Sequence, residues 1–218
     1  MPENAEPPQP AAEAEPPAST PTPSEPSAEP STAPKVRNLD AHALRGLAHP
    51  LRIRLLAALR HNGPATASQL AEQLGESSGA TSYHLRQLAA HGFVEDAPEH
   101  GKGRERWWRA SHEGTSFDET MTHDADPATR SAAEVFLHEI ATIHAQEMNT
   151  WLGTSHTWST EWRRGADLSD FTLRLTADQA HELIHKMHDL INSYRDLGPA
   201  EETETVRFHT HVFPRTSD

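Results

Sequence analysis

Apolar residues between positions 39 and 108 predict a run of short helices followed by two strands. They recur three or four positions apart from Leu39 to Leu47, and again from Leu51 to Leu59. This is the period of a helix that buries one face. Pro50 suits the first turn of the second helix, because its missing N–H would have no partner there. Asn62-Gly63-Pro64 ends that helix.

A third and a fourth helix follow, separated by a glycine. The pattern predicts a helix over 67–74, capped by Thr66 or Ser68, and Gly75 supplies a sharp turn. Ser77 can cap the next helix, which turns Leu85 and Leu88 inward and ends at Gly92. Two helices joined by a tight turn are typical of a helix-turn-helix unit.

Two strands complete this part of the chain. Residues 93–96 and 105–109 alternate like strands, and residues 98–103 connect them as a wing tip. Trp107 and Trp108 point to opposite faces, so one of them should pack on the helices. The order of helix, turn, helix, strand and strand predicts a winged DNA-reading domain over residues 38–112.

The charge is unevenly distributed along the chain, so the net charge of the whole chain is misleading. The 218 residues carry a net charge of −13, which alone disfavours nucleic-acid binding. Residues 1–37 carry −4 and residues 113–218 carry −11, whereas residues 38–112 carry +2. The winged segment is therefore the only basic part, and Lys102, Arg104 and Arg106 place positive charge near the wing tip, where a phosphate backbone could be met.

These motifs resemble the arsenical-resistance-repressor (ArsR-type) winged helix-turn-helix family. The matching stretches are LAHPLRIRLLAAL, ASQLAEQLGESSGATSYHLRQLAAHGFVE and GRERWWRA. The resemblance implies a homodimeric transcription regulator, usually a repressor that a ligand releases from DNA. It places Ser78, Gly79, Ser82 and Tyr83 toward the bases and Ser77, His84 and Arg86 toward the backbone. Thr81 completes the candidate DNA-contacting set.

Metal sensing does not follow from the resemblance. Metal-sensing members use cysteines in this region, and the chain has none. Other members pair Asp, His and Glu on a C-terminal helix at a spacing this chain lacks. His181, His185 and His188 share one helix face, and imidazoles at such spacing can bind zinc or nickel. A solvated face is the simpler interpretation, so we expect neither a metal site nor a cofactor.

The flanking regions differ from the winged segment. Residues 1–37 form a Pro/Ala/Glu-rich stretch with 11 of the 17 prolines, and we expect a disordered tail. Residues 113–218 are interpreted as a dimerisation and possible effector region. It contains a polar linker over 111–126, a long dimerisation helix over 127–152, and a small strand-helix-strand unit. That unit consists of a strand over 171–175, a helix opened by Thr176, and a strand over 206–212.

The sequence thus predicts a mainly helical α+β protein with double-stranded DNA and a second copy as partners. Its function would be sequence-specific transcription regulation at an inverted repeat. Two alternatives stay open: a sensor whose His/Trp-rich C-terminal unit binds a small molecule or metal, and a winged protein-interaction module without DNA binding. No enzyme motif is apparent. No signal peptide or membrane-length apolar run occurs, so we expect a cytoplasmic protein.

Overall fold

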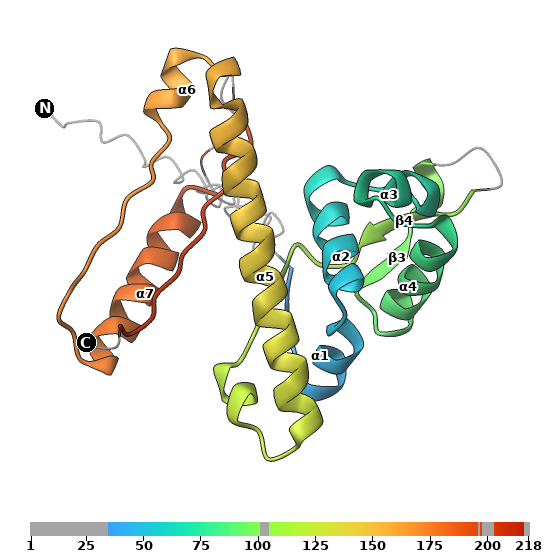
Figure 1. Ribbon diagram of the computed structural model, residues 1–218, viewed down its shortest axis with the longest axis horizontal. Helices are drawn as coiled ribbons and strands as arrows, with labels where there is room; N and C mark the ends of the chain where they lie inside the picture. Colours follow the sequence, from blue (N-terminus) through green and yellow to red (C-terminus); the bar gives the residue numbers. More distant parts are fainter. Residues whose placement is uncertain (1–34, 101–104, 196, 198–202, 216–218) are drawn as a thin grey trace, which may run out of the picture. The chain divides into compact units, whose positions relative to one another are not determined.

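The computed structural model describes residues 35–100, 105–195, 197 and 203–215. These residues are mainly helical, with two small sheets (Figure 1). Predictions for residues 1–34 and for the wing tip at 101–104 fall outside the described residues. No helix in the described ranges is long and apolar enough to cross a membrane.

The first two helices are α1 (Ala41–Leu47) and α2 (Pro50–Asn62), as the apolar spacing predicted. Both begin at side-chain caps. The Asp40 carboxylate accepts a hydrogen bond from the Ala43 N–H, and Nδ1 of His49 accepts one from the Leu51 N–H. These caps satisfy backbone donors that have no partner within a helix.

Helices α3 (Ala67–Leu74) and α4 (Ser78–Ala90) form the helix-turn-helix unit. Thr66 caps α3 in a reciprocal box with Gln69, which decides between the two predicted caps. An antiparallel sheet in the order β2-β4-β3 closes the domain. Its strands are β2 (Ala65–Thr66), β3 (Val94–Asp96) and β4 (Trp107–Ala110).

A parallel strand pair lies outside this sheet. Strand β1 (Val36–Asn38) pairs with β5 (Gly114–Ser116), and Val36 lies opposite Gly114. The predicted tail therefore ends too late, because its last residues are in a strand. The predicted linker at 111–126 is also structured: it holds β5 and a 3₁₀ helix, η2 (Glu119–His123). A further 3₁₀ turn, η1 (Pro98–His100), follows β3.

The core is built from all the helices of the winged domain and from the start of α5 (Pro127–Thr154). Trp108 of β4 is buried in it, while Trp107 is half-buried and stacks on His100. The aliphatic centre includes Leu44, Leu47, Leu55, Leu70, Leu85 and Leu88, with Phe93 beside them. Phe136 of α5 belongs to the same cluster, so the core continues beyond the predicted domain boundary at 112.

Helix α5 packs on α1 and α2 (Figure 1). Arg45 of α1 binds its start, donating to the Asp126 carboxylate at 3.1 Å and to the Thr129 hydroxyl at 2.9 Å. The buried residues of α5 all lie between Thr129 and Phe136. Beyond them the helix packs less tightly, with half-buried Ile140 and Ile143 against the core.

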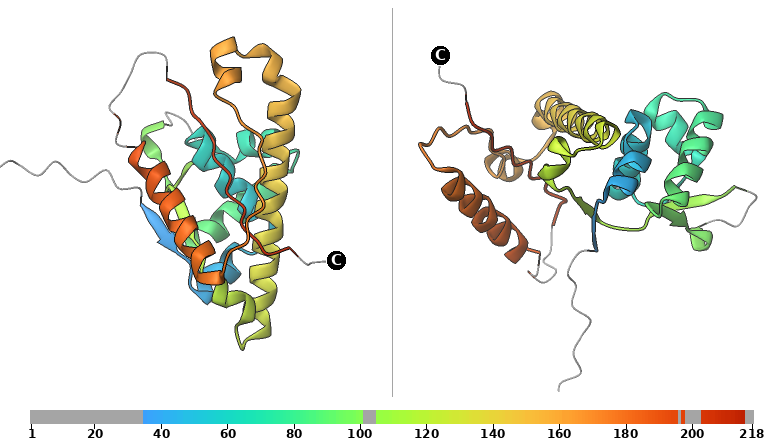
Figure 2. Two further views of the ribbon diagram at one scale, coloured as in Figure 1. Left: turned by 90° about the vertical axis from the view of Figure 1, so that its left-hand side faces the viewer. Right: turned by 90° about the horizontal axis from the view of Figure 1, so that it is seen from below.

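The C-terminal region contains the predicted helix but neither predicted strand. A 3₁₀ turn, η3 (Ser155–Thr157), precedes α6 (Thr160–Arg164), a short helix absent from the prediction, and α7 (Ala177–Ser193) is capped by Thr176 as expected. Residues 171–175 and 206–212 are extended but form no strand, so the predicted strand-helix-strand unit is wrong for the single chain (Figure 2). The physical reason is that neither segment has a backbone partner.

Trp158 contacts Trp151 and Trp162, at ring-centroid distances of 6.2 and 6.4 Å.

Candidate nucleic-acid interface

The turn between α3 and α4 is fixed from several sides. Gly75 adopts φ 68°, in the left-handed region that favours glycine. The Arg54 guanidinium of α2 donates to the Leu74 carbonyl at 2.9 Å and lies 3.7 Å from the Glu76 carboxylate. Ser77 caps α4 by accepting from the Ala80 N–H at 3.2 Å. The angle between the two helices is thus set by local hydrogen bonds.

Helix α4 buries one face and leaves the other open. Leu85 and Leu88 are fully buried, as predicted. On the opposite face Tyr83 is 51% exposed and Arg86 is exposed. Ser82 is half-buried between them. The helix therefore presents a tyrosine, a hydroxyl and a guanidinium, which are groups that contact base edges and phosphates.

The start of α4 is free of neighbours within the described chain. Ser77, Ser78 and Gly79 are all exposed. A side chain at Gly79 would meet nothing within 4 Å, so the fold itself does not require glycine there. The exposed N–H groups at this end carry the positive end of the helix dipole and favour phosphate.

Two candidates on α4 behave differently from the prediction. Thr81 is 0% exposed, so its assignment as a DNA contact is wrong: it belongs to the core-facing side with Leu85. His84 is half-buried, with its ring 4.3 Å from that of His49 and its Nδ1 buried. Burial lowers the pKa of both imidazoles below the ordinary histidine value, and nearby positive groups add to the shift. His84 therefore packs α4 against the cap of α2 with its Nδ1 away from solvent, and its predicted contact with the DNA backbone stays a prediction.

The described part of the wing, residues 94–100 and 105–110, carries less free positive charge than its sequence suggests. One edge of the Arg106 guanidinium, through Nε and Nη2, donates to both oxygens of the Asp96 carboxylate. The central carbon of the guanidinium lies 3.9 Å from the centre of the Trp108 ring. Arg109 binds Glu95 at 2.8 Å and Glu99 at 2.6 Å. Hydrogen bonding to Arg106 lowers the pKa of the Asp96 carboxyl, so this pair stays charged. The predicted contacts Lys102 and Arg104 lie outside the described residues.

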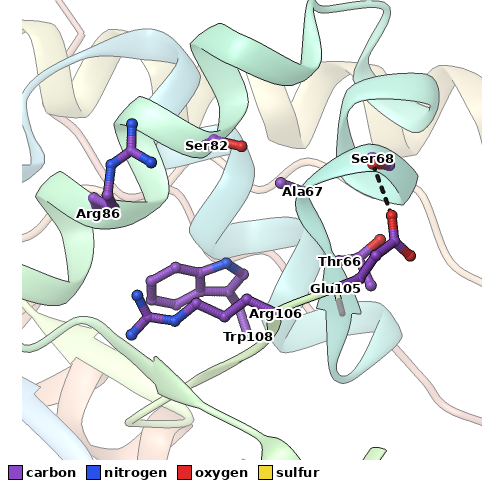
Figure 3. Close-up of a pocket in the computed structure, with 8 residues that line it drawn as sticks. All are labelled: Thr66, Ala67, Ser68, Ser82, Arg86, Glu105, Arg106 and Trp108. Carbon is purple, nitrogen blue, oxygen red and sulfur yellow. Dashed lines mark hydrogen bonds between the residues drawn. The ribbon is translucent and has the colours of Figure 1, made fainter. Parts of the chain in front are cut away.

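A cavity of about 230 Å³ lies between α3, α4 and the wing (Figure 3). Arg86 and Arg106 stand at one side, and Ser68 donates to the Glu105 carboxylate at 3.2 Å on the other. Its remaining lining residues are Thr66, Ala67, Ser82 and Trp108. The sequence analysis considered Thr66 and Ser68 only as helix caps and did not single out Glu105. Their place in this cavity depends on contacts between α3 and the wing, such as that of Ser68 with Glu105.

A second cavity, of about 480 Å³, adjoins the back of the helix-turn-helix unit. Its walls come from α2, α3, α5 and the C-terminal segment, including Arg54, Leu74, Ile143 and Arg207. Arg54 also holds the α3–α4 turn, so one residue borders both the cavity and the DNA-facing unit. This arrangement could not be predicted from the sequence, because the walls of the cavity come from segments far apart in the chain.

Histidines gather beside this cavity. The Glu147 carboxylate lies 3.3 Å from His61 of α2 and 2.8 Å from His209 of the C-terminal segment. His144 stacks on His209 at 3.8 Å between ring centres and lies 3.2 Å from His211. Burial first, and then the neighbouring imidazoles, lower the pKa of His144 to about 4. These ring contacts fasten the C-terminal segment to α5.

The predicted histidine face on α7 is only partly assembled. His181 and His185 approach to 2.9 Å between their Nε2 atoms, and His188 is exposed without joining them. Among the described residues, no group of three or more His, Asp or Glu side chains is placed to hold a metal ion.

Comparison with known proteins supports the helix-turn-helix prediction. Residues 47–97 match a family model described as a helix-turn-helix domain. These residues run from the end of α1 to the end of β3, and include the whole α3–α4 unit. They form a helix-turn-helix domain in a winged α+β fold, and the predicted fold class of this part is confirmed. A search of curated proteins finds no match.

Two solved structures resemble the chain at low similarity. One is RV1404 from Mycobacterium tuberculosis, with 17% identity over 74% of this chain and 84% of that one, at a TM-score of 0.28. The other is a double mutant of ZitR from Lactococcus lactis in its apo form. It shares 17% identity over 67% of this chain and 84% of that one, at a TM-score of 0.27. At these TM-scores the likeness carries no argument about function.

Proposed function

We propose that the chain is a sequence-specific DNA-binding transcription regulator that works as a homodimer, most simply as a repressor. The observation that carries the proposal is the open face of α4, with Tyr83 and Arg86 exposed beside the uncrowded Gly79. An α-helix fits the major groove, where each base pair presents a distinct pattern of donors and acceptors. The helix-turn-helix match over residues 47–97 supports the same reading.

Within this proposal the residues have separate tasks. Tyr83 and Ser82 face base edges, while Arg86 and the N-terminal N–H groups of α4 meet phosphates. The cavity between α4 and the wing takes a backbone phosphate beside Arg86, because Arg106 is held by Asp96. Two copies related by a two-fold axis place their α4 helices in successive major grooves, so half-sites lie about 10 bp apart or a multiple of that. No catalytic step is assigned to the chain.

The test is selection of bound duplexes from a random pool with the full chain at near-physiological salt. An inverted repeat is expected. Tyr83→Phe should then alter the preference among bases at one position of each half-site, whereas Arg86→Ala should weaken binding to all sequences alike. Recovery of no motif, with binding that disappears as salt rises, contradicts sequence-specific regulation and favours the protein-interaction alternative.

A second candidate function is control of DNA affinity by a small molecule. The cavity of about 480 Å³ favours it, because that volume suits a small ligand and Arg54 links its wall to the α3–α4 turn. Two arginines, Arg54 and Arg207, face a single carboxylate, Glu147, there, so a ligand with a carboxylate or phosphate is preferred. Thermal-shift screening of small anions against the wild type and Arg207→Gln tests this role: stabilisation is expected only for the wild type, and stabilisation of neither contradicts it.

A further inference from the structure

The C-terminal region exposes large apolar side chains along two extended segments. Phe171 is 84% exposed in residues 166–176, and Phe208 is 66% exposed in residues 203–215. Leu173, Val206 and Val212 are exposed in the same segments. Single apolar residues on a surface need no explanation, but several large ones along two segments indicate an interface.

The backbone of these segments is also unpaired. Among the described residues, 166–175 and 203–215 make no backbone-to-backbone hydrogen bond. The last segment is nevertheless held on one side, because His209 contacts Glu147 at 2.8 Å and Arg207 contacts it at 3.5 Å. Alternation turns Phe208 to the other side, away from α5. Residues 203–215 are thus held in place on one side like a strand. Their backbone N–H and C=O groups are unpaired, and the apolar side chains on their other face are exposed.

Helix α7 has an apolar stripe that the described chain covers only in part. Leu183, Ile184, Met187 and Ile191 recur at helical spacing and are half-buried, and no residue of α7 is fully buried. Helices in water owe most of their stability to packing of such a stripe. Its Thr176 capping box sets where the helix begins, but cannot replace that packing.

The segment that precedes the winged domain cannot supply the missing cover. Residues 1–34 contain no large apolar residue apart from Met1. DNA is excluded as the occupant, because residues 113–218 carry a net charge of −11. Two strands and one helix from a single chain make a marginal sheet, whereas two copies bring four strands and two helices. A second copy therefore offers both the backbone partners and the apolar cover.

We infer that a second copy of this chain covers this surface, with residues 171–175 and 206–212 of the two copies joined in one sheet beneath their α7 helices. The inference rests on the homodimer of the proposed function and identifies which part of the chain forms it. Dimerisation by this sheet fixes the distance between the two α4 helices through α5. The extended segments that are exposed in the single chain then become strands when the dimer forms.

The experiment compares the full chain with Phe171→Lys/Phe208→Lys by light scattering coupled to gel filtration. The wild type is expected at twice the chain mass and the double variant at the chain mass. Thr172→Lys is the matched control, because Thr172 is exposed on the other face of the same segment and should leave the dimer intact. Circular dichroism confirms that each variant keeps its helices. A wild-type monomer, or a double variant that remains dimeric at the same concentrations, overturns the inference.

Hydrogen exchange of backbone amides tests the same interface independently and needs no substitutions. The amides of residues 171–175 and 206–212 should be protected in concentrated protein and exchange freely on dilution below the dimer's dissociation constant. Protection that does not depend on concentration would mean that the two segments pair within one chain. DNA binding by the double variant separates this inference from the proposed function. If the monomeric variant keeps its base preference on a single half-site, the proposed DNA-reading function stands. If the wild type is a dimer but selects no DNA sequence, the proposed function is rejected and the dimer is not.

Discussion

The guanidinium of Arg54 in α2 donates to the carbonyl oxygen of Leu74, the last residue of α3, at 2.9 Å. That carbonyl belongs to the helix end, where acceptors lack a partner within the helix. Arg54→Met keeps most of the side-chain stem and removes the donor. We expect it to lower the free energy of unfolding by about 1–2 kcal/mol, measured by urea denaturation. Arg163→Met, on the exposed helix α6, is the matched control and should change it by less than about 0.5 kcal/mol.

Substitution of Gly79 should affect DNA binding without destabilising the fold. An alanine there meets nothing within 4 Å, and alanine favours a helix over glycine by up to about 1 kcal/mol. Gly79→Ala should therefore hold or raise the melting temperature while weakening binding to the selected operator by roughly tenfold, which is about 1.4 kcal/mol. Gly153→Ala, in α5 and equally uncrowded, provides the control. Unchanged DNA affinity would remove the start of α4 from the interface.

The Arg106–Asp96 pair limits the positive charge that the wing offers to DNA. Asp96→Asn removes the carboxylate charge and frees the guanidinium for phosphate. Binding should tighten on all sequences alike, and the slope of log affinity against log salt should steepen by about one unit. Asp167→Asn makes the same charge change outside the winged domain and should have little effect. A gain restricted to one sequence would contradict a backbone role for Arg106.

The pH dependence of stability should carry the signature of His144. Its pKa is lowered to about 4 in the folded chain, whereas the unfolded value is 6.5. The unfolded chain therefore binds more protons between these values, so stability is complete above about pH 6.5 and falls as the pH drops toward 4. His144→Gln should flatten this part of the profile by on the order of 1 kcal/mol, less than the shift alone implies because the ring is partly solvated. Chemical denaturation of both proteins at pH 7 and pH 5 measures the difference.

Local signals predicted the helix-turn-helix unit well. Gly75, the Thr66 cap and the Ser77 cap act over a few residues, so the sequence placed α3 and α4 nearly to the residue. Thr81 was misjudged because its hydroxyl marks it as polar, although the helix turns it toward the core. Its spacing of four residues from the inward-facing Leu85 already placed it on the buried face of α4.

Long-range features escaped the sequence. Strands β1 and β5 have three residues each and lie far apart in the chain, so neither has a periodicity of its own. At residues 171–175 and 206–212, by contrast, the sequence predicted strands that the single chain does not form. Their alternation correctly separates His209 from Phe208, but alternation says nothing about whether a strand partner lies in the same chain.

The pairing of Val36 with Gly114 has a consequence for the order of folding. Closing so long a loop costs entropy before it gains hydrogen bonds, so this pair should form after the helices of the winged domain have docked. It should also be among the first contacts to open in the native state, at little cost to α3 and α4. The beginning and the end of the winged domain would then separate together, loosening the connection to α5 while the DNA-reading helices stay folded.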